Sequence, residues 1–132
     1  MAITVSTMFI TVDDPEAALA FYRDALGLEV RQDVENAGFR WITLGAPGQD
    51  VDIVLSQAHG GRSTTEADAL LKLVTQGSLQ AAIFSSDDLE ATFDALVQSG
   101  AEVLEEPKDQ FWGVRDCAVR DPAGNMVRVA QA

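Results

Sequence analysis

Short apolar runs separated by polar turns dominate the chain and predict eight β-strands. The runs combine β-branched and other apolar side chains, which is the composition of strands. Two other segments, each opening at an Asp and ending at a Gly, repeat apolar side chains at helical spacing and predict helices over 14–26 and 88–99. We place the strands at residues 4–12, 28–34, 39–44, 51–55, 79–85, 102–105, 114–120 and 126–130.

One supersecondary unit occurs twice in the chain. Residues 12–30 run from Asp-Asp-Pro-Glu-Ala through a helix to Gly-Leu-Glu-Val, and residues 86–103 run from Asp-Asp-Leu-Glu-Ala through a helix to Gly-Ala-Glu-Val. The repeat predicts an α+β fold in which two paired β-α-β-β-β modules form a single domain over 1–132. Module 1 covers about 4–56 and module 2 about 79–131. The polar, Gly-rich residues 57–78 form the linker, in which Glu66–Val74 could form a short helix.

Composition narrows the class of protein. The 132 residues carry a formal net charge of −12, which argues against nucleic acid as a partner and favours solubility or attraction of cationic ligands. The single cysteine, Cys117, excludes an internal disulfide and is expected to be buried in the core. No apolar run is long enough to span a membrane and no secretory signal opens the chain, so we expect no membrane partner and a cytoplasmic location.

Two stretches resemble the vicinal oxygen chelate superfamily, which includes glyoxalase I, bleomycin resistance proteins and extradiol dioxygenases. They are Val12-Asp13-Asp14-Pro15-Glu16 leading to Phe21-Tyr22-Arg23-Asp24-Ala25-Leu26-Gly27-Leu28, and Asp121-Pro122-Ala123-Gly124-Asn125. The resemblance implies that the two modules form an incomplete barrel around a cavity, often completed across a dimer, and we therefore expect a homodimer. It does not fix an activity, because one fold hosts several unrelated chemistries.

Strand alternation indicates which side chains face this cavity. Met8, Ile10 and Val12 suit the first helix, which leaves the odd-numbered positions of that strand for the cavity. The same reasoning on the other strands, together with the two indoles, gives the expected ligand-binding set: Thr7, Phe9, Trp41, Asp52, Ala81, Trp112, Asp116 and Arg128. For Trp41 and Trp112, packing in the core or at a dimer interface is an equal alternative.

Metal-dependent members of the resembled superfamily hold a divalent ion with His, Gln or Glu at three strand positions. Here those positions hold Thr7, Ala81 and Arg128. Alanine has no ligand atom and arginine offers only donors, so we expect no metal and no cofactor. Arg128 has two alternatives: an internal ion pair with Asp116 or Asp52, or an anchor for an anionic group of a ligand.

These observations favour a metal-independent small-molecule binding protein, similar to the bleomycin-resistance-type proteins that sequester antibiotics. A ligand bearing both a cationic and an anionic group would match the acidic chain and Arg128. The alternative is an enzyme of the same fold, a lyase, isomerase or dioxygenase, with His59 or Asp116 as acid–base group. A third hypothesis is an interaction or regulatory module with a closed cavity. His59 is the only histidine and is otherwise an exposed loop residue.

Overall fold

The computed structural model describes all residues, 1–132, and follows the predicted order of strands and helices. None of its helices has the length and apolarity needed to cross a lipid bilayer. The elements are β1 (Thr7–Val12), α1 (Pro15–Leu19), η1 (Ala20–Ala25), β2 (Glu29–Asn36), β3 (Phe39–Gly45), β4 (Asp52–Gln57), α2 (Thr64–Thr75), β5 (Gln80–Ser86), α3 (Leu89–Gln98), β6 (Glu102–Asp109), β7 (Arg115–Arg120) and β8 (Met126–Gln131).

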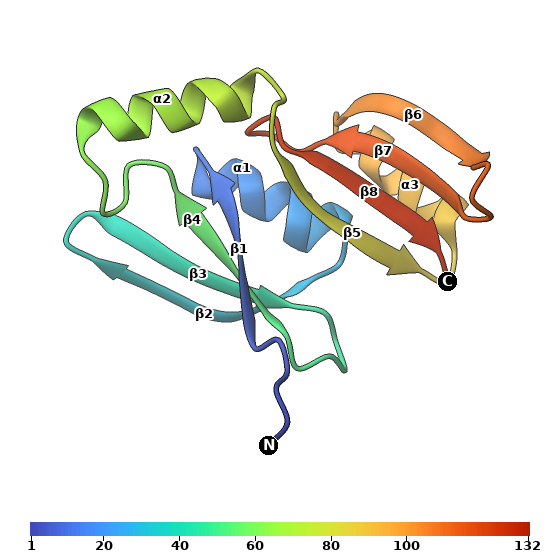
Figure 1. The fold of residues 1–132 in the computed structure, drawn as a ribbon, viewed down its shortest axis with the longest axis horizontal. Helices are drawn as coiled ribbons and strands as arrows, with labels where there is room; N and C mark the ends of the chain where they lie inside the picture. Colours follow the sequence, from blue (N-terminus) through green and yellow to red (C-terminus); the bar gives the residue numbers. More distant parts are fainter.

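Each module forms one four-stranded sheet with the same topology (Figure 1). The strand order is β1-β4-β3-β2 in the first sheet, here called sheet A, and β5-β8-β7-β6 in the second, sheet B. The first strand of each module pairs in parallel with the last, and the remaining pairs are antiparallel. The sheets lie side by side and do not close into a barrel within one chain, which confirms the α+β class with paired modules.

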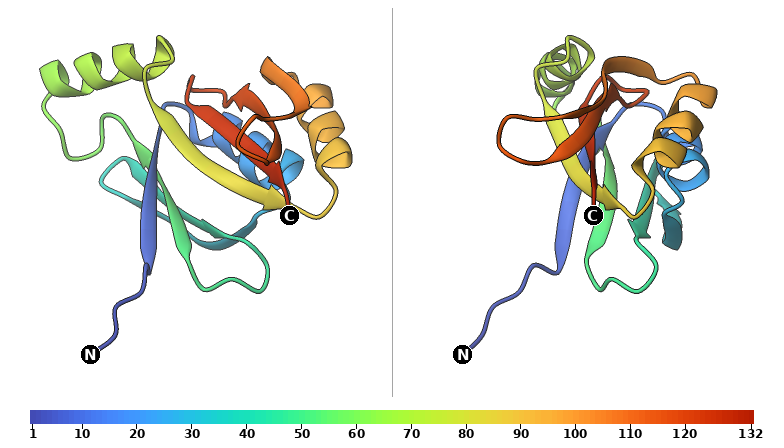
Figure 2. Two further views of the ribbon diagram at one scale, coloured as in Figure 1. Left: turned by 45° about the vertical axis from the view of Figure 1, so that its right-hand side comes forward. Right: turned by 90° about the vertical axis from the view of Figure 1, so that its right-hand side faces the viewer.

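Both sheets turn one face toward the helices and leave the other uncovered. In Figure 2, α1 and α3 lie together on one side of the two sheets, and the opposite side, here called the open face, carries no helix across its middle. The core lies on the helix side, where apolar side chains of both sheets meet those of α1, η1 and α3. Ile10, Leu55, Tyr22, Leu96, Val119 and Val127 are among its buried members.

The first helix differs from the single α-helix that the sequence predicts. Asp14 caps it by accepting the backbone N–H of Glu16 at 3.0 Å, with Pro15 at the first helical position. From Ala20 the helix widens into the π-helical turn η1, so that the N–H of Leu26 bonds the carbonyl of Phe21 at 3.0 Å. Apolar spacing alone does not separate these two helix types.

The linker is more ordered than the sequence predicts. Ser63 caps α2 by accepting the N–H of Glu66 at 3.2 Å, and the helix continues to Thr75. Its Ala67 and Val74 are buried against the rest of the molecule, which stabilises the helix in place. The short helix that the sequence allowed over Glu66–Val74 is therefore present, and it extends over Thr64–Thr75.

The Asp121–Asn125 turn joins the two modules. Oδ1 of Asp121 accepts the backbone N–H groups of Ala123, Gly124 and Asn125 at 2.9–3.0 Å, which fixes the turn. The side-chain amide of Asn125 then donates to the carbonyl of Thr11 in β1 at 2.7 Å. A turn of module 2 is thus hydrogen-bonded to the first strand of module 1, and sheet A and sheet B keep a fixed relation.

Candidate functional site

The open face of sheet A carries large apolar side chains that no part of the chain covers. Phe9, Val34 and Trp41 are exposed there, and Trp41 keeps 50% of its surface in solvent. Register explains the grouping, since Val34 pairs with Trp41 across the β2–β3 ladder and therefore shares its face. Thr7 and Phe9 were predicted to lie on the face opposite the first helix. The burial of Ile10 and Val12 on the helix side agrees with this prediction.

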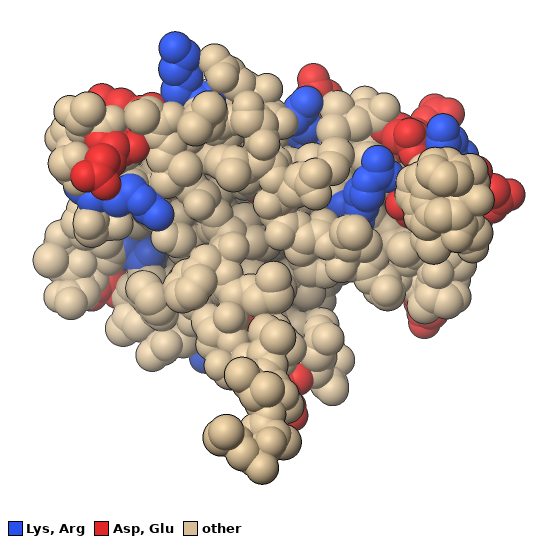
Figure 3. All heavy atoms as spheres, in the orientation of Figure 1, with Lys and Arg blue, Asp and Glu red and all other residues tan.

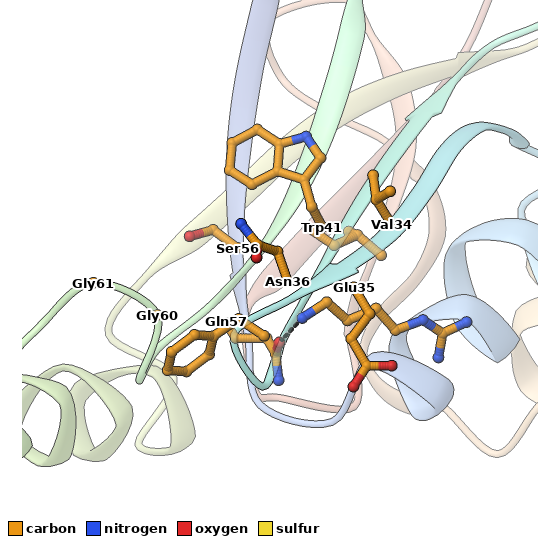
Figure 4. A pocket seen from close by; sticks show the side chains of 11 residues that line it. Val34, Glu35, Asn36, Trp41, Ser56, Gln57, Gly60 and Gly61 are labelled. Atoms are coloured by element: carbon orange, nitrogen blue, oxygen red, sulfur yellow. Dashed lines mark hydrogen bonds between the residues drawn. The ribbon is translucent and has the colours of Figure 1, made fainter.

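A cavity of about 730 Å³ opens at the end of this sheet, between the β2–β3 hairpin and the loop after β4. We call it the Trp41 pocket. Figure 4 shows Trp41, Val34 and Asn36 projecting from the hairpin, with Ser56 and the Gly60–Gly61 loop across from them. The lining residues are Val34, Glu35, Asn36, Phe39, Arg40, Trp41, Leu55, Ser56, Gln57, Gly60 and Gly61.

The pocket exists because strands β3 and β4 part before their ends. Their ladder covers only Ile42 to Leu44 against Ile53 to Leu55. Beyond it, the side chain of Gln57 takes the place of a strand and accepts the backbone N–H of Arg40 at 2.9 Å. Because this side chain satisfies a backbone donor that would otherwise lack a partner, the strands can separate without losing that hydrogen bond.

Charges at the pocket leave one carboxylate without a partner. The guanidinium of Arg40 bonds Asp33 at 2.7 and 2.9 Å and also contacts Glu16, so its charge is already balanced. The hydrogen bond from Arg40 holds the pKa of Asp33 below its usual range, and the two acidic partners raise the pKa of Arg40. Glu35, the cross-strand neighbour of Arg40, forms no ion pair; Figure 4 shows it on the side of the hairpin away from Trp41, where its charge makes that edge of the pocket acidic.

The open face of sheet B carries a polar cluster instead of an aromatic one. Arg128 donates to the buried carboxylate of Asp116 at 3.2 and 3.3 Å, and Gln110 donates to the same carboxylate at 2.8 Å. Glu105 also contacts Gln110 and lies 3.7 Å from Arg128. Of the alternatives for Arg128, the structure shows the internal ion pair with Asp116, whereas Asp52 pairs with Arg31 at 2.8 Å.

The structure does not bring the eight expected ligand-binding residues together in one site. Of the set, only Trp41 lines the pocket; Thr7, Phe9 and Asp52 lie elsewhere on sheet A. Asp116 and Arg128 belong to the polar cluster of sheet B. The remaining two residues, Ala81 and Trp112, lie differently from the alternation that placed them.

Two of the expected orientations are corrected. Ala81 is half-buried and packs against the core, because the register shifts between Gln80 and Ala82 and breaks the alternation. Trp112 lies in the turn between β6 and β7 rather than on a strand, because β7 begins only at Arg115. Strand β6 correspondingly runs past the predicted Glu105 to Asp109.

Several pocket residues were missed by reading the sequence. Phe39 and Val34 could have been found from strand alternation. Phe39 lies two residues before Trp41 on the same strand, and Val34 pairs with Trp41 across the ladder. Ser56, Gln57, Gly60 and Gly61 carry no such signal, because their place depends on where the β3–β4 ladder ends and how the following loop folds. His59, next to these glycines, is half-exposed and lies 3.2 Å from Asp68.

The three positions of the family-type metal site do not fit a divalent ion in this chain. Thr7 offers one neutral hydroxyl, Ala81 has no ligand atom and packs on the core, and Arg128 is a cation paired with Asp116. No group of three or more His, Cys, Asp or Glu side chains in the structure has the arrangement of a metal site. The donor set thus differs from that of a metal-dependent member.

Comparison with known proteins agrees with the fold and the motifs. The two paired β-α-β-β-β modules are shared with solved structures that cover almost the whole chain. A family model described as glyoxalase/bleomycin resistance protein/dioxygenase superfamily matches residues 4–129. The chain belongs to this superfamily.

Individual relatives cover almost the whole chain. The uncharacterized protein YurT from Bacillus subtilis (strain 168) is 30% identical over 132 residues, 99% of each protein. The crystal structure of UcmS2 is 28% identical with a TM-score of 0.86 and covers 98% of both chains. TnmS3, an antibiotic binding protein from Streptomyces sp. CB03234, is 28% identical with a TM-score of 0.76, over 99% of this chain and 98% of its own.

Proposed function

We propose that this protein binds a small aromatic molecule in the Trp41 pocket and sequesters it unchanged. The observation that carries the proposal is the pocket itself, a cavity of about 730 Å³ with Phe39 and Trp41 in its wall. That volume falls within the roughly 300–1,000 Å³ typical of small-molecule sites, and aromatic walls with a few polar groups are their usual lining. The similarity to TnmS3, named an antibiotic binding protein, supports a ligand of antibiotic type.

The lining groups suggest what the ligand offers. A flat ring system stacks on an exposed indole such as Trp41. The amides of Asn36 and Gln57 and the hydroxyl of Ser56 supply donors and acceptors for carbonyl or hydroxyl substituents at the ring edge. Because Arg40 is already balanced and Glu35 is not, a cationic group on the ligand is favoured over an anionic one.

The working form proposed here is a homodimer. Phe9, Trp41 and Ile83 expose large apolar surfaces on the open face, which a second copy would cover. Figure 3 shows that charged side chains gather along the left, upper and right-hand edges of this face and leave its middle largely uncharged, although the chain carries a net charge of −12. An uncharged centre with a charged border is the usual arrangement of a protein interface.

Fluorescence titration with 9-aminoacridine, a flat cationic dye, tests the proposed site. We expect saturable binding with one dye per pocket, and at least a tenfold loss of affinity in Trp41→Ala. Val97→Ala, which removes an exposed apolar side chain on α3, is the control and is expected to bind normally. Mass spectrometry of the recovered dye is expected to give its original mass.

Two results would contradict the proposal. Equal affinity of Trp41→Ala and the unsubstituted chain for the dye would show that the dye does not bind in the Trp41 pocket. A changed mass of the recovered dye, proportional to protein and time, would replace sequestration with catalysis.

A further inference from the structure

We propose that the side-chain contacts of Arg31, here called the latch, hold sheet A together on one side of the short β3–β4 ladder and so set how far the Trp41 pocket opens on the other side. The guanidinium serves as a built-in cation of the β3–β4 loop, residues 46–51. The effect on the pocket rests on the proposed function for its ligand. The latch itself stands on separate observations and is tested first, without any ligand.

The first observation is the set of oxygen atoms around the Arg31 guanidinium. Nη1 donates to the carboxylate of Asp52 at 2.8 Å and to the carbonyl of Val51 at 3.1 Å. Nη2 donates to the carbonyl of Ala46 at 3.0 Å and also to that of Gln49. We call these four oxygen atoms the oxygen cage. Because one cation bonds three carbonyls of a single loop, it fixes the path of that loop.

The second observation is how β2 delivers this side chain. The β2–β3 register shifts between Val30 and Gln32, so Arg31 is the extra residue of a β-bulge. A bulge re-aims its side chain, and here the side chain reaches the loop that follows β3. Gly45 of β3 leaves room for it, since an added Cβ would overlap the Cζ atom of Arg31. The φ of Gly45 is not positive, so this glycine provides space rather than backbone freedom.

The third observation is the place of the latch in sheet A. Strands β3 and β4 pair only between 42–44 and 53–55. On the pocket side of this ladder, the hydrogen bond from the Arg40 backbone to the Gln57 side chain joins the two strands. On the other side, Arg31 joins the end of β3 to the start of β4. In Figure 1 the β2–β3 hairpin, which carries the pocket, and the β3–β4 loop lie at opposite ends of β3.

The short ladder connects the latch to the pocket. Two strands that share three residue pairs can change their relative angle, and contacts on both sides of the ladder restrict that change. Loss of the Arg31 contacts removes the restriction at one end. The angle between β3 and β4, and with it the width of the pocket, then varies more freely. Arg31 does not line the pocket and is therefore a positioning residue.

Hydrogen exchange of Arg31→Ala tests the latch without ligand. The backbone N–H of Asp52, which donates to the carbonyl of Ser6 at 2.9 Å, lies where β4 leaves the loop. We expect exchange over 46–53 to become about tenfold faster in the variant, because the loop loses its charge-assisted hydrogen bonds. Exchange over Arg115–Arg120 in sheet B is expected to stay unchanged. Equal exchange over 46–53 in the variant and the unsubstituted chain would overturn the latch.

Ethylguanidinium supplies what Arg31→Ala removes. Because Gly45 leaves room for it, the free cation is expected to enter the oxygen cage of the variant and restore slow exchange over 46–53. Tetramethylammonium has the same charge but no N–H donors, and is expected to have no effect. Ethylguanidinium is also expected to leave the unsubstituted chain unchanged, because its cage is filled. Absence of rescue in the variant would show that these oxygens form no cation site.

Gly45→Ala tests the same contacts without removing the charge. The new Cβ displaces the guanidinium of Arg31, and we expect exchange over 46–53 to be as fast as in Arg31→Ala. Ethylguanidinium is not expected to rescue this variant, because the Cβ occupies its place. The control is Arg115→Ala, which removes an exposed arginine of sheet B paired with Glu90 and is expected to leave exchange over 46–53 unchanged. Unchanged exchange in Gly45→Ala would contradict the latch.

Titration with 9-aminoacridine measures the effect on the pocket. We expect Arg31→Ala to bind the dye roughly threefold to tenfold more weakly, the range of coupling through packed elements, and ethylguanidinium to restore the affinity. Arg115→Ala loses the same charge far from the pocket and is expected to bind normally. Unchanged affinity in Arg31→Ala would show that the latch does not act on the pocket.

The two proposals fail in different ways. If ethylguanidinium restores slow exchange in Arg31→Ala but no chain binds the dye, the proposed ligand is wrong and the latch stands. If the dye binds with the expected dependence on Trp41 but Arg31→Ala exchanges and binds like the unsubstituted chain, the pocket stands and the latch is wrong.

Discussion

The hydroxyl of Tyr22 donates a hydrogen bond of 2.6 Å to Oδ2 of Asp121, 99 residues further along the chain. The wide turn η1 places this tyrosine, and the Asp121–Asn125 turn places its acceptor. Both groups are buried, so the bond connects module 1 to module 2 inside the core.

Replacement of Tyr22 by Phe is expected to lower the free energy of unfolding by about 1–3 kcal/mol, because Asp121 loses one of its donors in a buried place. Urea denaturation followed by circular dichroism measures the loss. Phe93→Leu, a conservative change on α3 that leaves this bond intact, is the control and is expected to cost less. Equal stability of Tyr22→Phe and the unsubstituted chain would show that water replaces the bond without cost.

Stability is also expected to fall above pH 10. Burial, reinforced by the neighbouring Asp121 carboxylate, raises the pKa of Tyr22 far above its ordinary value of 10.0. Above pH 10 the unfolded chain releases the phenol proton and the folded chain keeps it, so unfolding gains about 1.4 kcal/mol of driving force per pH unit. Tyr22 is the only tyrosine, and tyrosinate absorbance is therefore expected to rise only as the chain unfolds. A titration near pH 10 in the folded protein would contradict this.

Gly124→Ala is expected to destabilise more than Gly48→Ala. Both glycines have positive φ, so each substitution strains the backbone by roughly 1–2 kcal/mol. A Cβ at Gly124 would in addition lie 2.4 Å from the carbonyl oxygen of Val74 at the end of α2, whereas at Gly48 nothing lies within 4 Å. Thermal unfolding of the two variants gives the comparison; equal loss would mean that α2 shifts freely away from the turn.

The Arg128–Asp116 pair is expected to behave as a coupled unit. Arg128→Met leaves the buried carboxylate of Asp116 with Gln110 alone, and we expect a loss of about 1–3 kcal/mol of folding free energy. Adding Asp116→Asn removes that charge, so the double variant is expected to be more stable than Arg128→Met. A double-mutant cycle in urea measures the coupling. Additive losses would show that the two side chains contribute independently.

Glu35→Gln is expected to separate charge from stacking in the pocket. Affinity for 9-aminoacridine is expected to fall by roughly twofold to fivefold, the range of an exposed ion pair, because the rim loses its unpaired carboxylate. Binding of acridone, the uncharged dye of similar shape, is expected to stay unchanged. The measurement is repeated at high salt, where the difference between the two dyes should shrink. An equal loss for both dyes would mean that Glu35 acts through the shape of the pocket.

Most of the fold was predictable from local patterns, because each strand and helix carries its own periodicity and cap. Asp14 and Asp88 cap their helices as predicted, and the faces of β8 follow strict alternation. In β1, Ile10 and Val12 are buried as predicted, whereas Met8, expected on the same face, is exposed. The widening of α1 into η1 was not predictable, since the apolar spacing of residues 19–26 fits a regular α-helix equally well. The shift at Ala81 was equally hidden, because an irregularity in one strand depends on its partner strand.

The candidate site was predictable only in part. Trp41 was chosen as an aromatic residue on a strand, and the structure places it in the pocket wall. Gln57 and Gly60 had no local signal, because the pocket depends on where the β3–β4 ladder ends. For Arg128 the sequence left open an internal ion pair, with Asp116 or Asp52, and a ligand anchor. The structure pairs it with Asp116, because both residues lie on the same face of neighbouring strands.

The hydrogen bond between Tyr22 and Asp121 also makes the two copies of the repeat unequal. The matching positions of the other copy do not reproduce it, since Leu96 occupies the helix place of Tyr22 and the turn at Ala46-Pro47-Gly48 has no aspartate. A chain built from two copies of module 1 would have a buried hydroxyl without an acceptor, and two copies of module 2 would have a buried carboxylate without a hydroxyl. The halves share one architecture, but they are no longer interchangeable parts.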